Sequence, residues 1–253
     1  MNNLLLAIDQ IWNGRMNINW QNIWDKKGFA PSANHSLMQL IKFNGFDTGC
    51  GSYREDQWKK LIKDFIDRTG LVPTDKVLEL GCGSGAFLYV LNQSVRAKYF
   101  GLDYSMPLLN VAKRVLKQAK FCCAEADEDA FEDEKFDIIF SHSVFHYFED
   151  LEYAYNVLDR WTRRLSKGGK LVLMDLNDIA HQKEYHEFRK IGANQPGSYE
   201  KKYKLLDHLF LNKSDLKRQL IELKMSNIEF FPHSVREYGN SIFRFNLICT
   251  KAE

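Results

Sequence analysis

The sequence has few cysteines, and none of them stands in the spacing of a metal or redox motif. Its five cysteines include no Cys-x-x-Cys pair, and the adjacent Cys122 and Cys123 cannot readily bridge each other. No stretch approaches the roughly 20 apolar residues of a membrane span. The N-terminus lacks a leading basic region and a small-residue cleavage site. We therefore expect reduced thiols and a cytoplasmic protein with no membrane partner.

The sequence also lacks an excess of charge of either sign. Its 253 residues hold 35 Lys and Arg against 33 Asp and Glu, a formal net charge of +2. This balance gives no overall attraction to nucleic acid or to an anionic membrane, so nucleic acid is not an expected partner. Hydrophobic residues make up 45% of the chain, enough for the core of one large domain or of a domain with an appendage.

Short apolar runs alternate with amphipathic stretches from residue 76 onward. The pattern predicts strands at residues 76–80, 98–102, 120–123, 136–141 and 170–176. It predicts helices between them at residues 86–94, 106–118 and 150–165, with Gly168 and Gly169 ending the last helix. Strands separated by helices imply right-handed crossovers and a parallel sheet covered on both faces. We therefore predict a doubly wound, mostly parallel α/β fold.

The segment before this core is predicted to be helical. Residues 1–73 form an N-terminal cap whose last helix carries Trp58 on its apolar stripe and has Gly70 as its C-cap. The remaining residues, 74–253, form the α/β domain.

The segment after the fifth strand departs from the pattern. Residues 176–213 have weak periodicity and are predicted to form a cap insertion over the sheet edge. Ser214 is the expected N-cap of a following helix. Two further strands, 227–231 and 241–250, have no helix between them, so we predict that they pair antiparallel.

The stretch VLELGCGSGAF, residues 77–87, places three glycines directly after the first predicted strand. A phosphate-binding loop needs G-x-x-x-x-G-K-[ST] and a dinucleotide fingerprint needs G-x-G-x-x-G, and this spacing matches neither. Glu79 lies two residues before the first glycine, and Asp103 ends the second strand. A carboxylate here opposes a phosphate but suits ribose hydroxyls and a cationic centre. The pattern indicates a nucleoside with a positive charge, the alternative being a turn without ligand.

At these residues the chain resembles a class I S-adenosylmethionine-dependent methyltransferase of the small-molecule type. VLELGCGSGAF is similar to the family's first motif, GLDYS to its second, AEADEDAF to its third and FDIIFSHSVFHYF to its fourth, with LSKGGKLVLMD closing the set. The resemblance implies a Rossmann-like methyltransferase fold with an antiparallel C-terminal strand. It also implies S-adenosylmethionine as cofactor and an O, N or C atom of a small molecule as methyl acceptor.

The resemblance further implies which residues bind the cofactor. Gly81 and Gly83 would let the backbone meet its methionine part, with Glu79 supporting the turn or the ammonium group. Asp103 would hold the ribose. The remaining implied contacts are Tyr104, Met106, Glu125 and Ala126 around the adenine and Ser141 near the methyl group.

Two of these predictions have local alternatives. Asp127 competes with Glu125, and eight of the thirteen residues from Glu125 to Asp137 are acidic, so this stretch also fits a solvated loop. Upstream, Tyr53 is a candidate wall of the pocket and Arg54 a candidate partner of the cofactor carboxylate, although Arg54 equally fits a surface residue.

His142 and His146 follow the fourth strand and are the candidate catalytic residues. Their spacing would also suit a metal pair, but no third ligand stands nearby, so we expect no metal. Either one also fits a structural histidine. In the functional hypothesis, His142 orients the acceptor or takes its proton. His208 is an alternative, and Tyr199 and Tyr203 are further candidate pocket walls.

Methylation of tRNA or protein is the alternative enzymatic hypothesis. The Asn/Asp-Pro-Pro-aromatic motif of amino-methylating enzymes is absent after the fourth strand, as is the Pro-Cys pair of base-methylating ones, and the basic stretches RWTRR and KKYK are short. A cofactor-binding protein without catalysis is the alternative from another class. The sequence predicts no oligomeric state.

Overall fold

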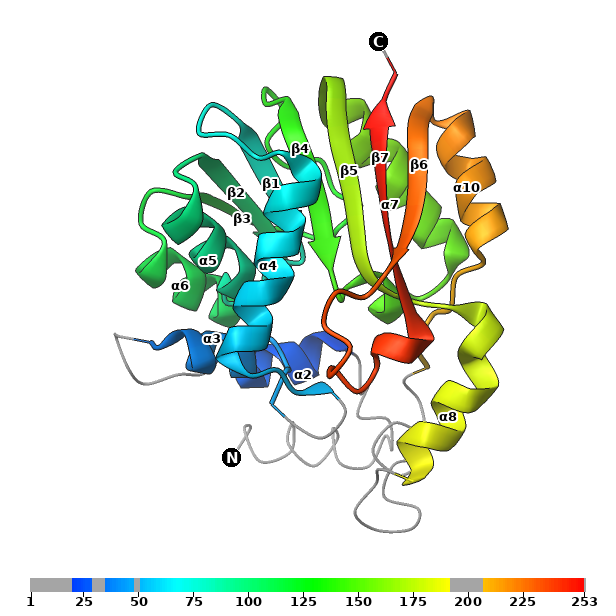
Figure 1. Ribbon diagram of the computed structural model, residues 1–253. Coiled ribbons are helices and arrows are strands. Elements are labelled where there is room, and N and C mark those ends of the chain that lie inside the picture. Colours follow the sequence, from blue (N-terminus) through cyan, green and yellow to red (C-terminus); the bar gives the residue numbers. More distant parts are fainter. Residues whose placement is uncertain (1–19, 29–34, 48–50, 192–206, 253) are drawn as a thin grey trace, which may run out of the picture.

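The computed structural model describes residues 20–28, 35–47, 51–191 and 207–252 (Figure 1). Its centre is a seven-stranded sheet of order β3-β2-β1-β4-β5-β7-β6. The strands are β1 (Lys76–Leu80), β2 (Lys98–Asp103), β3 (Lys120–Cys123), β4 (Phe136–His142), β5 (Leu165–Asn177), β6 (Met225–Pro232) and β7 (Arg244–Lys251). The first five pair in parallel, and β7 runs antiparallel to both β5 and β6. The predicted fold class and the antiparallel C-terminal pair are confirmed.

Helices cover both faces of this sheet (Figure 1). One face carries α4 (Glu55–Thr69), α5 (Ala86–Ser94) and α6 (Met106–Val115). The other carries α7 (Leu151–Arg164) and α10 (Lys213–Glu222). The helices predicted at residues 86–94, 106–118 and 150–165 correspond to α5, α6 and α7. Two separate apolar cores result, one on each side of the sheet, as a doubly wound fold requires.

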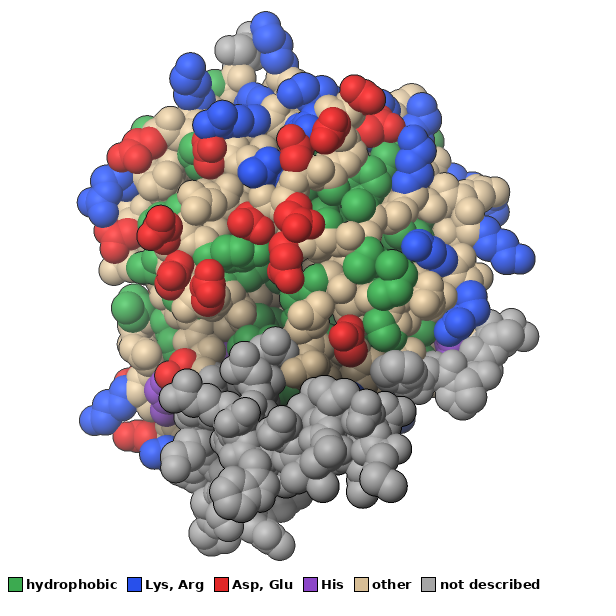
Figure 2. Space-filling model, turned by 180° about the vertical axis from the view of Figure 1, so that it is seen from behind, with side chains coloured by type: hydrophobic (Ala, Val, Ile, Leu, Met, Phe, Trp, Pro, Cys, Tyr) green, Lys and Arg blue, Asp and Glu red, His purple; other side chains and the backbone are tan. Residues whose placement is uncertain are grey.

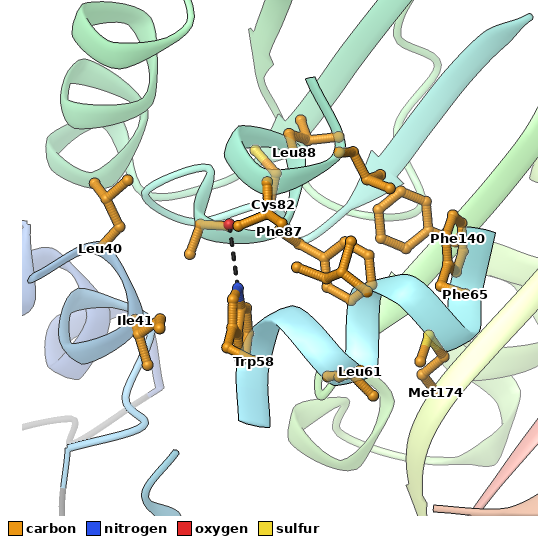
Figure 3. Packing of buried hydrophobic residues seen from close by; sticks show 14 of the residues in the cluster. Leu40, Ile41, Trp58, Leu61, Phe65, Cys82, Phe87, Leu88, Phe140 and Met174 are labelled. Atoms are coloured by element: carbon orange, nitrogen blue, oxygen red, sulfur yellow. Dashed lines mark hydrogen bonds between the residues drawn. The ribbon is translucent and has the colours of Figure 1, made fainter. Parts of the chain in front are cut away.

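Aromatic residues fill the core under α4 and α5 (Figure 3). Trp58 is fully buried, and its Nε1 donates a 3.2 Å hydrogen bond to the carbonyl oxygen of Ala86 at the start of α5. Phe65, Phe87 and Phe140 pack against one another nearby, edge-on or tilted, with ring centroids 4.7–5.3 Å apart. The predicted stripe of α4 is thus a packing face, and Gly70 ends the helix in the left-handed conformation, as predicted.

Two predicted boundaries are wrong. Gly168 and Gly169 do not end a helix but lie inside β5, because Leu165 already pairs with Phe136 and the register then shifts around the glycines. Gly168 has φ +71°, which glycine adopts without strain.

The second error concerns the cap of α10. The N-cap is Asn212 rather than Ser214, since the Asn212 Oδ1 accepts hydrogen bonds from the backbone amides of Ser214 and Asp215. Asparagine caps helices as well as serine does, so composition alone does not separate the two.

Short helices lie at the carboxyl ends of the parallel strands (Figure 1). They are α2 (Trp20–Lys27) and α3 (Leu37–Phe43) before the sheet and α8 (Gln182–Ile191) after β5, with single turns η2 (Phe145–Tyr147), η3 (Ile179–His181) and η4 (Ser241–Phe243). Helix α2 packs closely on α6: a Cβ at Gly28 would lie 2.5 Å from the backbone nitrogen of Leu108. Residues 1–19 and 192–206 of the predicted caps are outside the described residues, so the domain boundaries stay predictions.

The surface shown in Figure 2 carries mixed charge. Lys and Arg side chains are interspersed with Asp and Glu over this face, which lies on the side of α7 and α10. Among the described residues, no helix combines the length and apolar character needed to cross a membrane.

Candidate functional site

The three glycines form the turn between β1 and α5, and each has a positive φ: +72° at Gly81, +53° at Gly83 and +77° at Gly85. Side chains would also collide there. A Cβ at Gly81 would lie 2.4 Å from Val144 Cγ2, and one at Gly83 would lie 2.5 Å from Asn44 Oδ1. Both backbone conformation and space therefore demand glycine at these positions.

Asp103, the last residue of β2, binds this turn directly. Its Oδ2 accepts a 2.7 Å hydrogen bond from the amide of Gly83, and its Oδ1 accepts one of 2.8 Å from the amide of Ser105. Burial raises the pKa of Asp103 to about 6, opposed by these two amides. Each oxygen keeps a second lone pair, so the carboxylate can still accept hydrogen bonds from a ligand.

Asn44, just after α3, binds the turn from the other side. Its Oδ1 accepts a 2.7 Å hydrogen bond from the amide of Ser84, and its Nδ2 donates to the carbonyl of Cys82 over 3.3 Å. The Ser84 hydroxyl donates to the carbonyl of Leu40 in α3. The segment before α4 is therefore attached to the glycine turn by three hydrogen bonds.

A cavity of about 400 Å³ opens at this edge of the sheet. It extends from the glycine turn past Asp103 to the ends of β3 and β4, with α2 and the turn after α3 on its far side. Its lining residues are Trp20, Gln21, Trp24, Asn44, Phe46, Gly81, Gly83, Leu102, Asp103, Tyr104, Leu108, Ala124, Glu125, Ala126, His142, Ser143, Val144, Tyr147, Phe148, Glu149 and Tyr153.

Most of the predicted cofactor residues come together in this cavity: Gly81, Gly83, Asp103, Tyr104, Glu125 and Ala126 line it. The loop that carries the last two is tied to α7, since Trp161 Nε1 donates a 2.7 Å hydrogen bond to the carbonyl of Ala126. The competing Asp127 instead accepts a hydrogen bond from the Tyr153 hydroxyl, at 3.1 Å. Partial burial and its acidic neighbours raise the pKa of Glu125.

Two predicted residues lie behind the glycine turn rather than in the cavity wall. Glu79 is buried and its Oε2 has no hydrogen-bond partner among the described residues. Burial, reinforced by the charge of Asp103, raises the pKa of Glu79 well above its usual value. The hydroxyl of Ser141 is also buried and donates to the carbonyl of Leu80, over 3.0 Å. The Ser141 hydroxyl thus binds the last residue of β1, and Glu79 is a buried carboxyl of the same strand.

The other predicted residues of this set lie elsewhere. Met106 is 44% exposed at the start of α6 and does not line the cavity. Arg54 is at the surface, where its guanidinium pairs with Asp56 at 2.8 Å. Tyr53 is buried next to the cavity and its hydroxyl lies 2.8 Å from His233 Nε2. Tyr199 and Tyr203 are outside the described residues.

The two candidate catalytic histidines have different surroundings. His142 ends β4 and lines the cavity, and it is enclosed by the rings of Phe46 and Trp58, whose centroids lie 5.4 and 5.3 Å from its own. Burial lowers its pKa to about 3, so the imidazole is neutral at pH 7. His142 therefore offers the cavity an uncharged hydrogen-bonding group.

His146 lies deeper, behind the cavity. Its Nδ1 is 3.2 Å from NH1 of Arg244, which can only donate, so Nδ1 accepts and the proton is on Nε2. Burial lowers the pKa of His146 well below its usual value, and the charge of Arg244 adds to this effect. His208, the alternative candidate, stacks on Trp20 at 5.2 Å and contacts the Tyr185 hydroxyl through Nδ1 at 2.9 Å.

Sequence reasoning missed the residues that α2 contributes. Trp20, Gln21 and Trp24 line the cavity opposite the glycine turn, and Tyr147 packs edge-on against both tryptophans with ring centroids 4.5 and 5.3 Å away. The spacing of Trp20 and Trp24, four residues apart in NWQNIWDKK, places them on one side of a helix and was the available signal.

The described residues contain no group of three His, Cys, Asp or Glu side chains placed to hold a metal ion. Cys82, Cys122, Cys123 and Cys249 are free thiols, and Cys50 is outside the described residues. The polar groups that line the cavity include carboxylates, amides, hydroxyls and the imidazole of His142.

Residues 78–173 match the family model described as a methyltransferase domain. The match runs from β1 into β5 and includes the glycine turn and Asp103. This part of the chain is a methyltransferase domain. The mostly parallel sheet with an antiparallel C-terminal strand is the fold that the sequence resemblance implies.

Curated methyltransferases share part of the sequence. Phosphoethanolamine N-methyltransferase 1 of Arabidopsis thaliana is 26% identical over 117 residues, which are 45% of this chain and 23% of that protein. Demethylmenaquinone methyltransferase of Thermotoga maritima is 29% identical over 143 residues, 56% of each chain. The match thus spans about a quarter of the plant enzyme and about half of the bacterial one.

A solved structure shares the methyltransferase fold over most of its length. Magnesium protoporphyrin IX methyltransferase from Synechocystis PCC 6803, solved with bound SAH, superimposes with a TM-score of 0.57 at 13% sequence identity. The superposition covers 92% of this chain and 95% of that one. At this identity the likeness extends to the fold alone.

Proposed function

We propose that this methyltransferase transfers a methyl group from S-adenosylmethionine to a small-molecule acceptor. The observation that carries the proposal is one cavity that joins the glycine turn, Asp103 and His142 beneath the aromatic residues of α2. Its volume of about 400 Å³ is within the range of roughly 300–1,000 Å³ usual for small-molecule sites.

The hydrogen-bonding groups around the cavity fit this cofactor. Asp103 has free lone pairs for two ribose hydroxyls, and Glu125 and the backbone of Ala126 lie where an adenine would reach the ends of β2 and β3. The side chains nearest the glycine turn are acidic or neutral, which favours a ligand with ammonium and sulfonium charges over one with phosphates. The proposed binding set is therefore Gly81, Gly83, Asp103, Tyr104, Glu125 and Ala126.

Five predicted residues do not contact the cofactor directly in this proposal. Glu79 and Ser141 support the strand end behind the turn, while Met106 and Arg54 lie at the surface. Tyr53 acts behind His142 rather than as a cavity wall.

When bound, S-adenosylmethionine supplies an electrophilic methyl group, and the work of the protein is alignment and exclusion of water. Trp20, Trp24 and Phe46 exclude water from the cavity. His142 lies at the opposite end from the adenine-facing loop and is neutral, so it orients an acceptor by a hydrogen bond. His146 does not reach the cavity and holds Arg244 in place behind it.

The proposal is tested by two measurements on the full chain. Calorimetry with S-adenosylmethionine should show one binding site, whereas reduced NAD should not bind. Radiolabelled S-adenosylmethionine incubated with a small-molecule extract should then yield labelled products. Failure of calorimetric binding would reject the cofactor assignment. Binding with no labelled product from small molecules, tRNA or protein would identify a cofactor-binding protein without catalysis.

A further inference from the structure

A buried carboxylate and a buried imidazole stand on neighbouring strand ends behind the cavity. His142 of β4 pairs in register with Met174 of β5, and Asp175 is the next residue of β5. His142 is 6% exposed and Asp175 is fully buried. In the described part of the chain, His142 Nε2 and Asp175 Oδ1 each lack a hydrogen-bond partner. Unpartnered buried polar atoms are costly, so two of them in one place require an explanation.

Hydrogen bonds to the other atoms of Asp175 fix its position. It has φ +62° at a register shift between β5 and β7, a conformation that a non-glycine residue adopts at a cost of about 1–2 kcal/mol. Its amide donates a 2.7 Å hydrogen bond to Asn246 Oδ1. Arg244 NH1 donates to its Oδ2 at 2.8 Å and to its carbonyl oxygen at 3.0 Å, and the Tyr238 hydroxyl donates to Oδ2 at 3.3 Å. The bonds from Arg244 and Tyr238 therefore both fall on Oδ2, and Oδ1 has no hydrogen-bond partner in the described part of the chain.

The two groups are within electrostatic reach of each other. The charge of Asp175 raises the pKa of His142 against the larger effect of burial, and the proximity of His142 lowers the pKa of Asp175. Arg244 and His233 act on both groups. The titratable hydroxyls of Tyr238 and Tyr53 also face Asp175, and the hydroxyl of Ser143 lowers the pKa of Asp175 further.

Tyr53 is the competing partner for both open atoms. The Val235 amide donates to His233 Nδ1, so the proton of this ring is on Nε2, which donates to the Tyr53 oxygen. The Tyr53 hydroxyl proton is then available to another acceptor, and the charge of Asp175 affects the pKa of Tyr53. Because a carboxylate oxygen has two lone pairs, Asp175 Oδ1 can accept from Tyr53 and from His142 together.

We propose that Asp175 is a positioning residue for His142: its Oδ1 accepts a hydrogen bond from the Nε2–H group through one water molecule, which leaves Nδ1 to accept a hydrogen bond in the cavity. The bulge in β5 directs the Asp175 carboxylate toward His142, and the ion pair with Arg244 fixes its orientation. The role in turnover rests on the proposed methyltransferase function. Because Nδ1 of His142 accepts a hydrogen bond, this arrangement favours a methyl acceptor that presents an N–H or O–H group to His142.

Nitrogen-15 NMR of the histidine-labelled full chain tests this assignment. The His142 signals are identified by their loss in His142→Gln. In the wild type we expect the tautomer with the proton on Nε2. In Asp175→Asn we expect the Nδ1-protonated form to appear, because an amide can donate to Nε2 instead of accepting from it. Tyr53→Phe should keep the wild-type tautomer.

Asp178→Asn is the matched control, since this second carboxylate at the end of β5 pairs with Lys213 at 2.7 Å and not with a histidine. It should also leave the tautomer unchanged. A wild-type His142 protonated on Nδ1 would overturn the proposal even if Asp175→Asn failed to fold. So would a tautomer that responds to Tyr53→Phe and not to Asp175→Asn.

Calorimetry on the same variants separates this inference from the proposed function. Asp175→Asn should bind S-adenosylmethionine as tightly as the wild type, while turnover of an identified acceptor should fall roughly 10²-fold, the effect of misplacing a reacting group by about 1 Å. Absence of S-adenosylmethionine binding in the wild type would reject the function and leave the tautomer result standing. A cofactor affinity lowered tenfold or more by Asp175→Asn would instead reject the positioning role.

Discussion

The amide of Gly83 donates a 2.7 Å hydrogen bond to Oδ2 of Asp103, so the end of β2 and the turn after β1 form one unit. The second oxygen of the same carboxylate is bonded to the amide of Ser105 at the start of α6. Asp103 therefore has two functions in our proposal: it shapes the glycine turn and it faces the ribose. Substitution of Asp103 should therefore change the affinity for S-adenosylmethionine and its pH dependence.

Replacing Asp103 by Ala should weaken binding of S-adenosylmethionine by about 10- to 100-fold, because charge-assisted hydrogen bonds contribute about 1.5–3 kcal/mol each. Isothermal calorimetry measures this loss. Asp133→Ala, which removes an exposed carboxylate of the acidic loop, is the control and should bind like the wild type. Equal affinities for all three proteins would exclude Asp103 from the site.

The affinity should also depend on pH. Burial raises the pKa of Asp103 to about 6, so the ionised form that accepts two ribose hydroxyls becomes populated as the pH rises through that value. We expect tighter binding at pH 7 than at about pH 5. The sign for stability is opposite: a carboxyl whose folded pKa is raised contributes stability below about pH 4 that is lost as the pH passes 6. Calorimetric titrations across this range in the wild type and Asp103→Asn distinguish the effect of this group from that of Glu125.

Gly83→Ala should destabilise the fold more than Gly168→Ala. Both glycines have positive φ, which costs alanine about 1–2 kcal/mol. A Cβ at Gly168 meets no atom within 4 Å, whereas one at Gly83 meets Asn44 Oδ1 and would disrupt its hydrogen bond to Ser84. We expect Gly83→Ala to cost about 1–3 kcal/mol more in urea unfolding. Equal losses would mean that Asn44 does not hold the turn.

Trp24→Ala should reduce the affinity for S-adenosylmethionine by about tenfold, since the indole lines the cavity and packs on Tyr147. Met106→Ala and Arg54→Ala should leave it unchanged, because neither side chain lines the cavity. The reverse result would favour the cofactor contacts predicted from the sequence over those proposed from the cavity. Calorimetry on the three variants decides between them.

Arg244→Met should make the protein sensitive to acid. The guanidinium is the main cause that holds the pKa of buried Asp175 below its usual value against desolvation, so the pair contributes stability that is present above about pH 4 and lost below it. Without Arg244 the carboxylate is buried and unpaired, at a cost of about 3–5 kcal/mol, and its pKa rises. The midpoint of acid unfolding, followed by circular dichroism, should shift to higher pH.

Lys213→Met is the comparison for this prediction, because Lys213 pairs with Asp178 at a partly exposed site. Its acid midpoint should stay close to that of the wild type. An equal shift in both variants would contradict the special role of the buried pair.

Local patterns in the sequence predicted the order and type of the elements well. The strands and helices from Lys76 to Leu176 have periodic apolar faces. The glycine turn belongs to the first motif of the methyltransferase resemblance, and Asp103 belongs to the second. Such signals are local, and each is contained in about fifteen residues. They were sufficient for the fold class and for seven of the 21 residues that line the cavity: Gly81, Gly83, Asp103, Tyr104, Glu125, Ala126 and His142.

Contacts between distant segments could not be predicted in this way. Asn44 binds Ser84 across 40 residues, and Arg244 binds Asp175 across 69. Neither pair leaves a pattern in the sequence, because a single polar residue looks the same whether it faces water or a partner. Trp24 was missed for a related reason. Helix α2 is short, and the sequence does not show that its apolar side faces a cavity formed by distant strands.

The strand order β5-β7-β6 bears on how the chain is synthesised and folded. β6 is synthesised before β7, but β7 is the strand with which it pairs. β6 can therefore join the sheet only after β7 has been synthesised. During that interval the edge of β5 is open, and Asp175 has no cation beside it because Arg244 is the first residue of β7. A nascent chain stalled before Arg244 would carry an exposed strand edge, a feature of an aggregation-prone intermediate, and its Asp175 carboxylate would lack the cation that pairs with it in the folded protein.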